Sequence, residues 1–440
     1  QNRTNSIDAA SCYGNIGKYY FENNDYRKAE YNFKISSDTY KEINGELSST
    51  YASSLNSLGI LYKKTDRYLE AEDHFKKYLE IIEKTNGNEN ENYSFALNNL
   101  AGLYEELGQY VKAENYYLES LEIKKNSKGE KSEMYAKSLK TVASFYKTIG
   151  NYSKSEECYI KSSEIYKEAN GELSSNYAFS LNSLGILYKH TDRYKEAEEH
   201  YIKCLEIIEK IYGKEHENYS FGMNNLAGLY EKLGQYSKAE NYFLQSLEII
   251  KKSKGESSLE YCNSLLSLAQ FYEELGKIQA AEQAYQKCLS LTSSQVGEIS
   301  LRYSSILHKI GVFYNDNFQF KKSFEALVNS QSILDQFYDH SHPEYLRVLT
   351  SLTDLASSIG DAASAEQGLL LVDSLLLKIC GGLHPDLIGI EKKIYDLYVS
   401  QDSLKQAFLW LKKRDDKLKI RSYNKSELAD LFNDYGEYYT

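Results

Sequence analysis

The chain contains little that would break a helix or mark a redox or membrane site. It has only two prolines in 440 residues, and because proline interrupts helix interiors, this scarcity is typical of helices joined by tight turns. No run of about 18 apolar residues occurs, which argues against a membrane span. The six cysteines include no C-x-x-C pair and no regular spacing, so they predict neither a disulfide framework nor a zinc site. We therefore expect free thiols and a reducing compartment, that is, a cytoplasmic protein.

Positive charge is also scarce. The formal net charge is −11, whereas a nucleic-acid binder would show a basic face, so nucleic acid is not an expected partner. The sequence also lacks the phosphate-binding G-x-x-x-x-G-K-[ST] pattern, the H-E-x-x-H metal pattern and the G-x-S-x-G nucleophile elbow. We expect no catalytic residue, metal site or cofactor within this segment, and hence no enzyme activity of its own.

Tyrosine is by contrast abundant, with 42 copies, and much of it follows a fixed spacing. One slot recurs every 42 residues and holds Tyr20, Tyr62, Tyr104, Tyr146, Tyr188, Tyr230, Tyr272, Tyr314, Ala356 and Tyr398. Ten repeats in register, without an insertion or deletion, predict a repeat array. In such an array each repeat buries its apolar face against its neighbours.

Each repeat is predicted to be a pair of helices. In the second repeat, apolar residues recur with helical periodicity over residues 49–63 and again over 68–84. The loop Asn86-Gly-Asn88 is expected to end the second helix, as Asn and Gly commonly do. Gly59 and Ala71 are predicted to lie where the two helices cross, because small residues allow the helix axes to approach closely.

The residue pattern carries a family resemblance. Leu-Gly/Ala-x-x-Tyr is followed by Gly-x-Tyr-x-x-Ala-Glu and by an aromatic residue four positions after the alanine, and this order resembles the tetratricopeptide (TPR) repeat. The 42-residue length, and segments such as Leu97–Tyr104 and Leu118–Ile123, look like the long variant found in kinesin light chains and many bacterial proteins. The resemblance implies an all-α, right-handed superhelical solenoid of ten helix-turn-helix repeats plus a partial eleventh.

That long variant often carries His-Pro-Asp in the loop before the first helix of a repeat. His342-Pro343-Glu344 and His384-Pro385-Asp386 match it, 42 residues apart. The slot of these histidines holds small polar residues in other repeats, which favours helix N-capping over metal binding: Asn90, Ser132, Ser174, His216, Ser258 and Ser300.

The predicted domain organisation is one array over residues 1–440. It comprises a divergent first repeat (1–42), well-matched repeats (43–294), degenerate repeats (295–424) and the first helix of a truncated repeat (425–440). A block of three repeats has duplicated, since Asn44–Ser49 returns as Asn170–Ser175, 126 residues later. Solenoids need polar capping elements at their ends, and because none is recognisable, we expect a longer protein.

The resemblance also suggests a binding site. In TPR proteins the first helix of each repeat lines a concave groove, where asparagines can hold an extended peptide. Here the matching slot holds Asn56, Asn98, Asn182 and Asn224. A carboxamide offers both a donor and an acceptor and can hold a peptide backbone without reading its sequence. The alternative is that these amides bond within the array and bridge adjacent helices.

A second surface is predicted in the ninth repeat. Its second helix, with Leu370 and Leu376, is apolar nearly all round, as buried helices are. It is either buried inside the array or covered by another domain or chain.

The first functional hypothesis is a protein- or peptide-binding scaffold. The second is the regulatory arm of a caspase-like (CHAT) protease in CRISPR-associated bacterial defence or in signalling, which similar arrays often precede. The third is a cargo adaptor similar to kinesin light chain, although no heptad coiled coil is visible.

Overall fold

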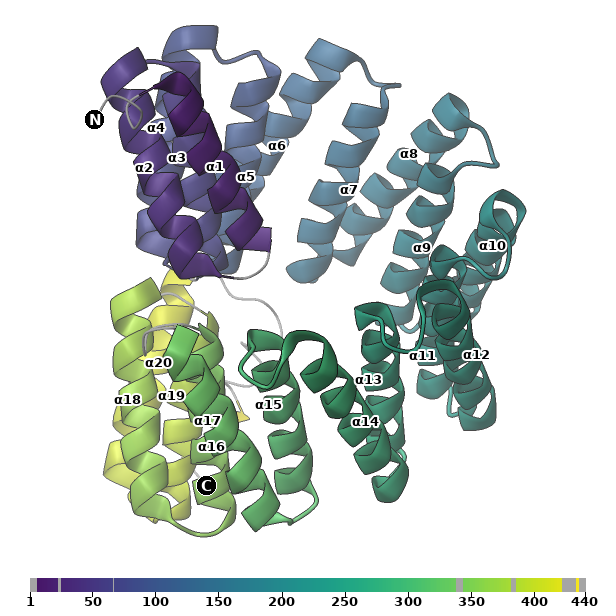
Figure 1. Cartoon of the computed structure of the whole chain (residues 1–440), viewed down its shortest axis with the longest axis vertical. Coiled ribbons are helices and arrows are strands. Elements are labelled where there is room, and N and C mark those ends of the chain that lie inside the picture. Colours follow the sequence, from purple (N-terminus) through teal and green to yellow (C-terminus); the bar gives the residue numbers. More distant parts are fainter. Residues whose placement is uncertain are drawn as a thin grey trace. The chain divides into compact units, whose positions relative to one another are not determined.

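The chain folds into helices throughout the part that the structure describes. The computed structural model describes residues 6–22, 25–65, 67–337, 343–380, 385–421 and 433–434. Within these ranges there are helices and no strands, which confirms the predicted all-α solenoid. The helices (Figure 1) are α1 (Ile7–Glu22), α2 (Tyr26–Asn44), α3 (Ser49–Lys64), α4 (Tyr68–Asn86), α5 (Glu91–Glu106), α6 (Tyr110–Lys128), α7 (Glu133–Thr148), α8 (Tyr152–Asn170), α9 (Ser175–His190), α10 (Tyr194–Tyr212), α11 (Glu217–Lys232), α12 (Tyr236–Lys254), α13 (Leu259–Glu274), α14 (Ile278–Val296), α15 (Leu301–Asp316), α16 (Phe320–Phe337), α17 (Pro343–Ser358), α18 (Ala362–Cys380), α19 (Pro385–Ser400) and α20 (Leu404–Arg421).

The helix boundaries agree with the sequence pattern to within two residues. Helix α3 ends at Lys64 and α4 at Asn86, one and two residues beyond the predicted ends. Gly87 follows α4 with φ of 79°, a left-handed conformation that glycine adopts without steric cost. The predicted helix of the truncated repeat (425–440) lies outside the described residues, apart from Asn433 and Asp434.

The predicted N-caps are confirmed wherever the structure describes them. Asn90 Oδ1 accepts a hydrogen bond from the backbone N–H of Tyr93 at 3.0 Å. His216 Nδ1 accepts one from the backbone N–H of Asn218 at 3.1 Å, so this histidine caps a helix, as predicted. The same role falls to Ser48, Ser132, Ser174, Ser258 and Ser300, whereas His342 and His384 lie outside the described residues.

The two helices of a repeat approach closely at the predicted small residues. A Cβ atom added to Gly59 would lie 2.5 Å from the Phe75 ring, which no real side chain allows. Ala71 is fully buried in the same contact region. Gly185 meets Tyr201 in the same way in the duplicated block, so the crossing is a property of the repeat.

The periodic tyrosine joins successive repeats. Its hydroxyl donates a hydrogen bond to a glutamate 32 residues earlier, on the second helix of the preceding repeat. A buried phenol needs such a partner, and this explains why tyrosine rather than phenylalanine holds the slot. The bonds are Tyr62–Glu30 (3.2 Å), Tyr104–Glu72 (2.8 Å), Tyr188–Glu156 (2.9 Å), Tyr230–Glu198 (2.5 Å), Tyr314–Glu282 (2.8 Å) and Tyr398–Glu366 (2.6 Å).

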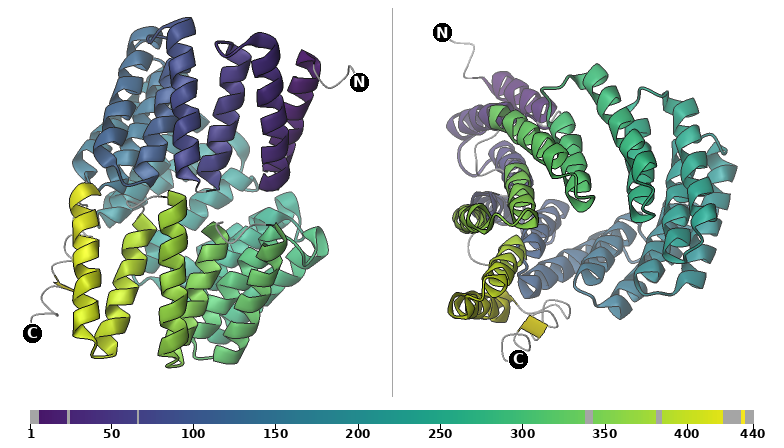
Figure 2. Two further views of the ribbon diagram at one scale, coloured as in Figure 1. Left: turned by 90° about the vertical axis from the view of Figure 1, so that its left-hand side faces the viewer. Right: turned by 90° about the horizontal axis from the view of Figure 1, so that it is seen from below.

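The helix contacts divide the chain into two compact units. Unit 1 comprises Gln1–Ser127 and Gln331–Thr440, and unit 2 comprises Lys128–Ser330. In unit 2 each helix from α7 to α15 packs against the next described one, as Figures 1 and 2 show, and α9 also contacts α11. In unit 1, α3 contacts α5 and α4 contacts α18. First helices of neighbouring repeats touch each other in both units, and we refer to the layer that they form as the inner layer.

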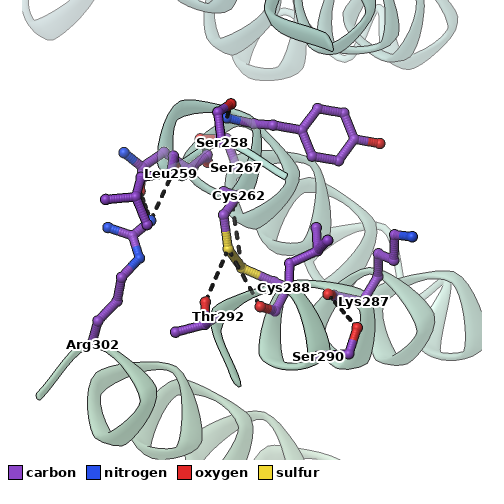
Figure 3. The surroundings of a disulfide bond; sticks show 12 residues. Ser258, Leu259, Cys262, Ser267, Lys287, Cys288, Ser290, Thr292 and Arg302 are labelled. Carbon is purple, nitrogen blue, oxygen red and sulfur yellow. Dashed lines mark hydrogen bonds between the residues drawn. A yellow bond between two sulfur atoms is a disulfide. The ribbon is translucent and has the colours of Figure 1, made fainter. Parts of the chain in front are cut away.

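One expectation about cysteine is wrong. Cys262 on α13 and Cys288 on α14 form a disulfide, with their Cα atoms 5.3 Å apart (Figure 3). These two slots are 26 residues apart. In three other repeats they hold serine pairs that are hydrogen-bonded to each other: Ser94 and Ser120 (Oγ–Oγ 2.9 Å), Ser220 and Ser246 (2.6 Å), and Ser304 and Ser330 (2.8 Å).

The remaining cysteine prediction holds for Cys204. It is a buried free thiol, and burial raises its pKa to about 12. Among the described helices, none combines the length and apolar character that a membrane crossing needs.

Candidate functional site

The inner layer of unit 2 presents one polar-aromatic face. On α9 this face is marked by Phe179, Asn182 and His190, which recur at helical spacing. On α11, Phe221 occupies the matching slot of Phe179, and Asn225 lies one residue beyond the slot of Asn182. All five side chains are exposed or half-buried, while the residues between them fill the core. We refer to this surface as the inner face of α9 and α11.

The asparagines bridge neighbouring helices. Asn225 Nδ2 donates to Asn182 Oδ1 at 2.6 Å in unit 2. Asn99 Nδ2 donates to Asn56 Oδ1 at the same distance in unit 1. For Asn56 and Asn182 the structure therefore shows the bridging bond that was the alternative to peptide binding. Their partners were not predicted from the sequence, because a donor 43 residues away is one position off the 42-residue register.

The other two predicted asparagines lie one residue before these partners. Asn98 and Asn224 are both half-buried. The Oδ1 atom of Asn224 is buried and has no hydrogen-bond partner. An unsatisfied buried acceptor costs about 1–3 kcal/mol. Among the four predicted asparagines, Asn224 therefore has a buried oxygen that a ligand N–H could satisfy.

Two exposed phenylalanines were missed by the sequence analysis. Phe179 is 37 % exposed and Phe221 is 61 % exposed, although both are large apolar side chains. They occupy the same slot of adjacent repeats, 42 residues apart, on helices that touch each other. The signal that reveals them is a bulky apolar residue at a slot that holds Ser53, Lys137 and Asn263 in other repeats.

Charged side chains lie at the C-terminal ends of the first helices, beside the inner face. In unit 1, Lys63 forms an ion pair with Glu106 at 3.3 Å. In the duplicated block the equivalent of Lys63 is Lys189, but the equivalent of Glu106 is Lys232. A neutral pair has therefore become a pair of cations.

The electrostatics of Lys189 reflect this exchange. Burial lowers the pKa of Lys189; Glu231 opposes this effect, whereas Lys232 and Lys147 add to it. Burial, together with Lys147 and Lys189, also lowers the pKa of His190. This end of the inner face has a surplus of positive charge that no single carboxylate balances.

A carboxyl pair follows on the next repeat. Burial and a hydrogen bond with Glu274 raise the pKa of Glu231 to about 7, against the opposing effect of Lys232 and Lys189. Two carboxyl groups that share a proton do not neutralise nearby lysines fully. The pair makes the charge of this edge sensitive to pH near neutrality.

Within the described ranges no group of three or more His, Cys, Asp or Glu side chains is arranged to hold a metal ion.

In the ninth repeat, Leu370 on α18 is 37 % exposed and Leu376 is only 6 % exposed. The two leucines proposed as one docking surface therefore lie in different environments.

Comparison with known families identifies the repeat. The profile of the tetratricopeptide repeat matches residues 50–126, 134–201, 181–252 and 220–294, which together exceed half of the chain. The chain belongs to the tetratricopeptide repeat family. This confirms the resemblance from which the solenoid was predicted. A comparison with curated proteins finds no match.

Several solved structures are similar to this chain at low sequence identity. BtubC (BKLC) from P. vanneervenii is 19 % identical, with a TM-score of 0.42 over 53 % of this TPR chain and 91 % of its own. A putative kinesin light chain from Podosopora anserina is 20 % identical, with a TM-score of 0.40 over 47 % and 97 %. A Rap protein complexed with Competence and Sporulation Factor is 12 % identical, with a TM-score of 0.45 over 87 % and 100 %.

Proposed function

We propose that unit 2 is a peptide-binding scaffold that holds an extended segment of a partner protein along the inner face of α9 and α11. The observation that carries this proposal is the exposure of Phe179 and Phe221, which occupy the same slot on two helices that touch each other. Exposed aromatic side chains beside polar groups are typical of interaction sites. No chemistry is required of the groove, which acts by binding alone.

The amides supply the polar part of the site. The Asn182–Asn225 bond uses one donor and one acceptor, and each carboxamide has capacity for further bonds. The unsatisfied Oδ1 of Asn224 would be relieved if the amide rotated toward a peptide N–H. Asn56 and Asn98 are proposed to serve a second segment in unit 1, where Phe95 is the exposed aromatic residue.

The positive charge at this end of the inner face favours an acidic partner. Lys189 and Lys232 stand where the first copy of the block has the Lys63–Glu106 ion pair. A carboxylate from a partner would take the place of the missing glutamate. The proposed ligand is therefore an extended peptide with an apolar residue for the phenylalanines and an acidic side chain or a terminal carboxylate for the lysines.

A peptide display library tests the proposal. We expect enrichment of acidic peptides on the wild-type chain and loss of that enrichment on Phe179→Ala/Phe221→Ala. Lys232→Glu restores the arrangement of the first block and should remove the preference for acidic peptides without loss of stability. Lys210→Glu, at an exposed position of α10, is the control with the same change of charge. Equal enrichment on all four proteins would contradict the proposal.

The finer functional hypotheses concern a longer protein. A regulatory arm of a CHAT protease and a cargo adaptor similar to kinesin light chain both contain a peptide-binding array and are compatible with this groove. Reading the coding sequence beyond Thr440 separates them, because a protease domain there would make the array its regulator. A domain docked near Leu370 belongs to the same hypothesis.

A further inference from the structure

A cavity opens in the first two repeats of unit 1. It has a volume of about 560 Å³ and is lined by residues of α1, α2 and α3, the helices that carry these labels in Figure 1. Its apolar walls are Phe21, Phe33, Tyr40 and Ile60. The rest of the lining is dominated by hydroxyl groups from the inner side of α3 and from α1 and α2. The volume falls in the range of about 300–1,000 Å³ that is typical of ligand pockets.

The asparagine bridge found between other first helices is missing between α1 and α3, and this leaves room for the cavity. The slot of Asn56, Asn98, Asn182 and Asn224 is occupied in the first repeat by Gly14. Between α3 and α5 the same step is closed by the Asn56–Asn99 bond. Between α1 and α3, Gly14 has no side chain, and the slot of Asn99 holds the shorter Ser57.

The hydroxyl groups of the lining present acceptors. Their hydrogens are used within the chain: Ser53 donates to Ser49 O at 2.9 Å, Ser57 to Ser53 O at 3.1 Å and Ser36 to Ala10 O at 2.7 Å. The hydroxyl oxygens keep lone pairs that can accept from a ligand. These three serines therefore favour a ligand with N–H or O–H donors.

The charges of the lining nearly cancel. Lys18 and Glu22 lie one helical turn apart, with Nζ and Oε1 separated by 3.8 Å, and both side chains are largely exposed. Neither charge is buried in the cavity, so a charged ligand would lose hydration without gaining a buried partner. The site favours a neutral group with a flat apolar body that fits between Phe33 and Ile60.

We propose that this cavity binds a neutral aromatic group that carries a hydrogen-bond donor, namely the phenol of a tyrosine or the indole of a tryptophan in a partner peptide. The aromatic body contacts Phe21, Phe33 and Ile60. The phenol O–H or indole N–H donates to a serine oxygen on α3. This site is separate from the inner face of α9 and α11 and does not depend on it.

Capped amino acids are suitable probes. Saturation-transfer NMR titrations would use N-acetyl-tyrosinamide and N-acetyl-tryptophanamide, with N-acetyl-phenylalaninamide as the ligand without a donor. We expect saturable binding of the first two and about 2- to 10-fold weaker binding of the third, which is the net value of one hydrogen bond. Free 4-ethylphenol distinguishes a small metabolite from a peptide side chain, and it should bind more weakly than the capped tyrosine.

Gly14→Asn is the decisive variant, because it places in the cavity the side chain that other repeats hold in this slot. A Cβ at position 14 meets only Ser36 Oγ, at 3.3 Å, and Asn is a better helix former than Gly, so the variant should fold. Gly14→Asn/Ser57→Asn rebuilds the whole bridge. Both should lower affinity at least 10-fold. Gly389→Asn, at a helical glycine with open space around it, is the matched control and should bind normally.

Each result has a defined meaning. Retained binding in folded Gly14→Asn, equal binding of the phenylalanine probe, tighter binding of 4-ethylphenol than of the capped tyrosine, or absence of saturable binding would each overturn the proposal. Should Gly14→Asn lose helicity, Ser57→Leu fills the cavity from α3 instead. It must then abolish binding for the proposal to stand.

Discussion

Tyr188 on α9 donates its hydroxyl hydrogen to Glu156 on α8 at 2.9 Å. Arg193 completes the group: its guanidinium lies over the Tyr188 ring, 4.2 Å from the centroid, and its Nη1 pairs with Glu156 at 2.7 Å. The same three-residue group recurs as Tyr62, Glu30 and Arg67. The register of the array is therefore maintained by a polar contact between repeats as well as by apolar packing.

This contact predicts a response to alkaline pH. Burial and the hydrogen bond to Glu156 raise the pKa of Tyr188 from 10.0 to about 12. The neutral phenol is favoured in the folded state, so its stabilisation is fully present below pH 10 and is lost as the pH rises through 12. We expect Tyr188→Phe to cost about 1.5–3 kcal/mol at pH 8 and to reduce the loss of stability between pH 10 and 12. Denaturant midpoints across this range provide the measurement, and an unchanged alkaline slope would count against the contact.

The carboxyl pair of unit 2 predicts a loss of stability in the same direction, with rising pH, but near neutrality. Glu231 has a folded pKa of about 7, against an ordinary value of 4.5. Its contribution to stability is fully present below pH 4.5 and is lost as the pH rises through 7. Glu231→Gln keeps the hydrogen bond with Glu274 and removes the charge. Melting temperatures between pH 5 and 8.5 should fall less steeply in the variant than in the wild type, while Glu248→Gln, on the exposed side of α12, should leave the slope unchanged.

The disulfide predicts sensitivity to reductant. Closing the loop between Cys262 and Cys288 should stabilise the fold by about 3.5 kcal/mol. Cys262→Ser/Cys288→Ser recreates the serine pair of three other repeats, so we expect it to fold and to respond no further to dithiothreitol. Cys204→Ser should respond to the reductant as the wild type does.

Thiol labelling shows where the bond forms. Disulfides are rare in the cytosol, so the proposed cytoplasmic location and the disulfide make different predictions. Alkylation of intact cells followed by mass spectrometry should find Cys262 and Cys288 protected if the bond forms there. If both are alkylated without prior reduction, the pair is a dithiol in that compartment.

The sequence predicted the architecture well because the repeat is local. Helix ends, N-caps such as Asn90 and the crossing at Gly59 depend on residues within one repeat, which the 42-residue register aligns directly. Contacts between neighbouring helices were harder to predict from the sequence. The Asn182–Asn225 bond spans 43 residues and the disulfide spans 26, and neither offset appears in a period of 42.

The site was predicted only in part for the same reason. Periodicity identified the helix face that carries Asn182, but it did not show that Asn225 would satisfy this amide. Phe179 and Phe221 were not singled out, because their exposure depends on how the helices pack.

Helix α18 offers a test of the docking hypothesis that avoids the core. Leu376 is buried, and a lysine there would unfold the helix whether or not a domain docks. Leu370 and Leu371 are exposed, so Leu370→Lys/Leu371→Lys should change stability by no more than about 0.5 kcal/mol per site. In a longer form of the protein, weaker protection of α18 from hydrogen exchange in this variant would support a docked domain. Identical protection would exclude it from this surface.

The asparagines of the inner layer provide the sharpest test of the groove. Replacing Asn98 and Asn224 by leucine removes two carboxamides that bridge no helices in the manner of Asn56 and Asn182. The unmet acceptor of Asn224 disappears with the substitution, so helicity and melting should be unchanged or slightly improved, while capture of acidic peptides should be lost. By contrast, Asn182→Leu alone leaves Asn225 without its partner and should lower stability by about 1–3 kcal/mol. If the double variant still captures peptides, Asn98 and Asn224 do not bind the ligand, and the phenylalanines and lysines alone form the site.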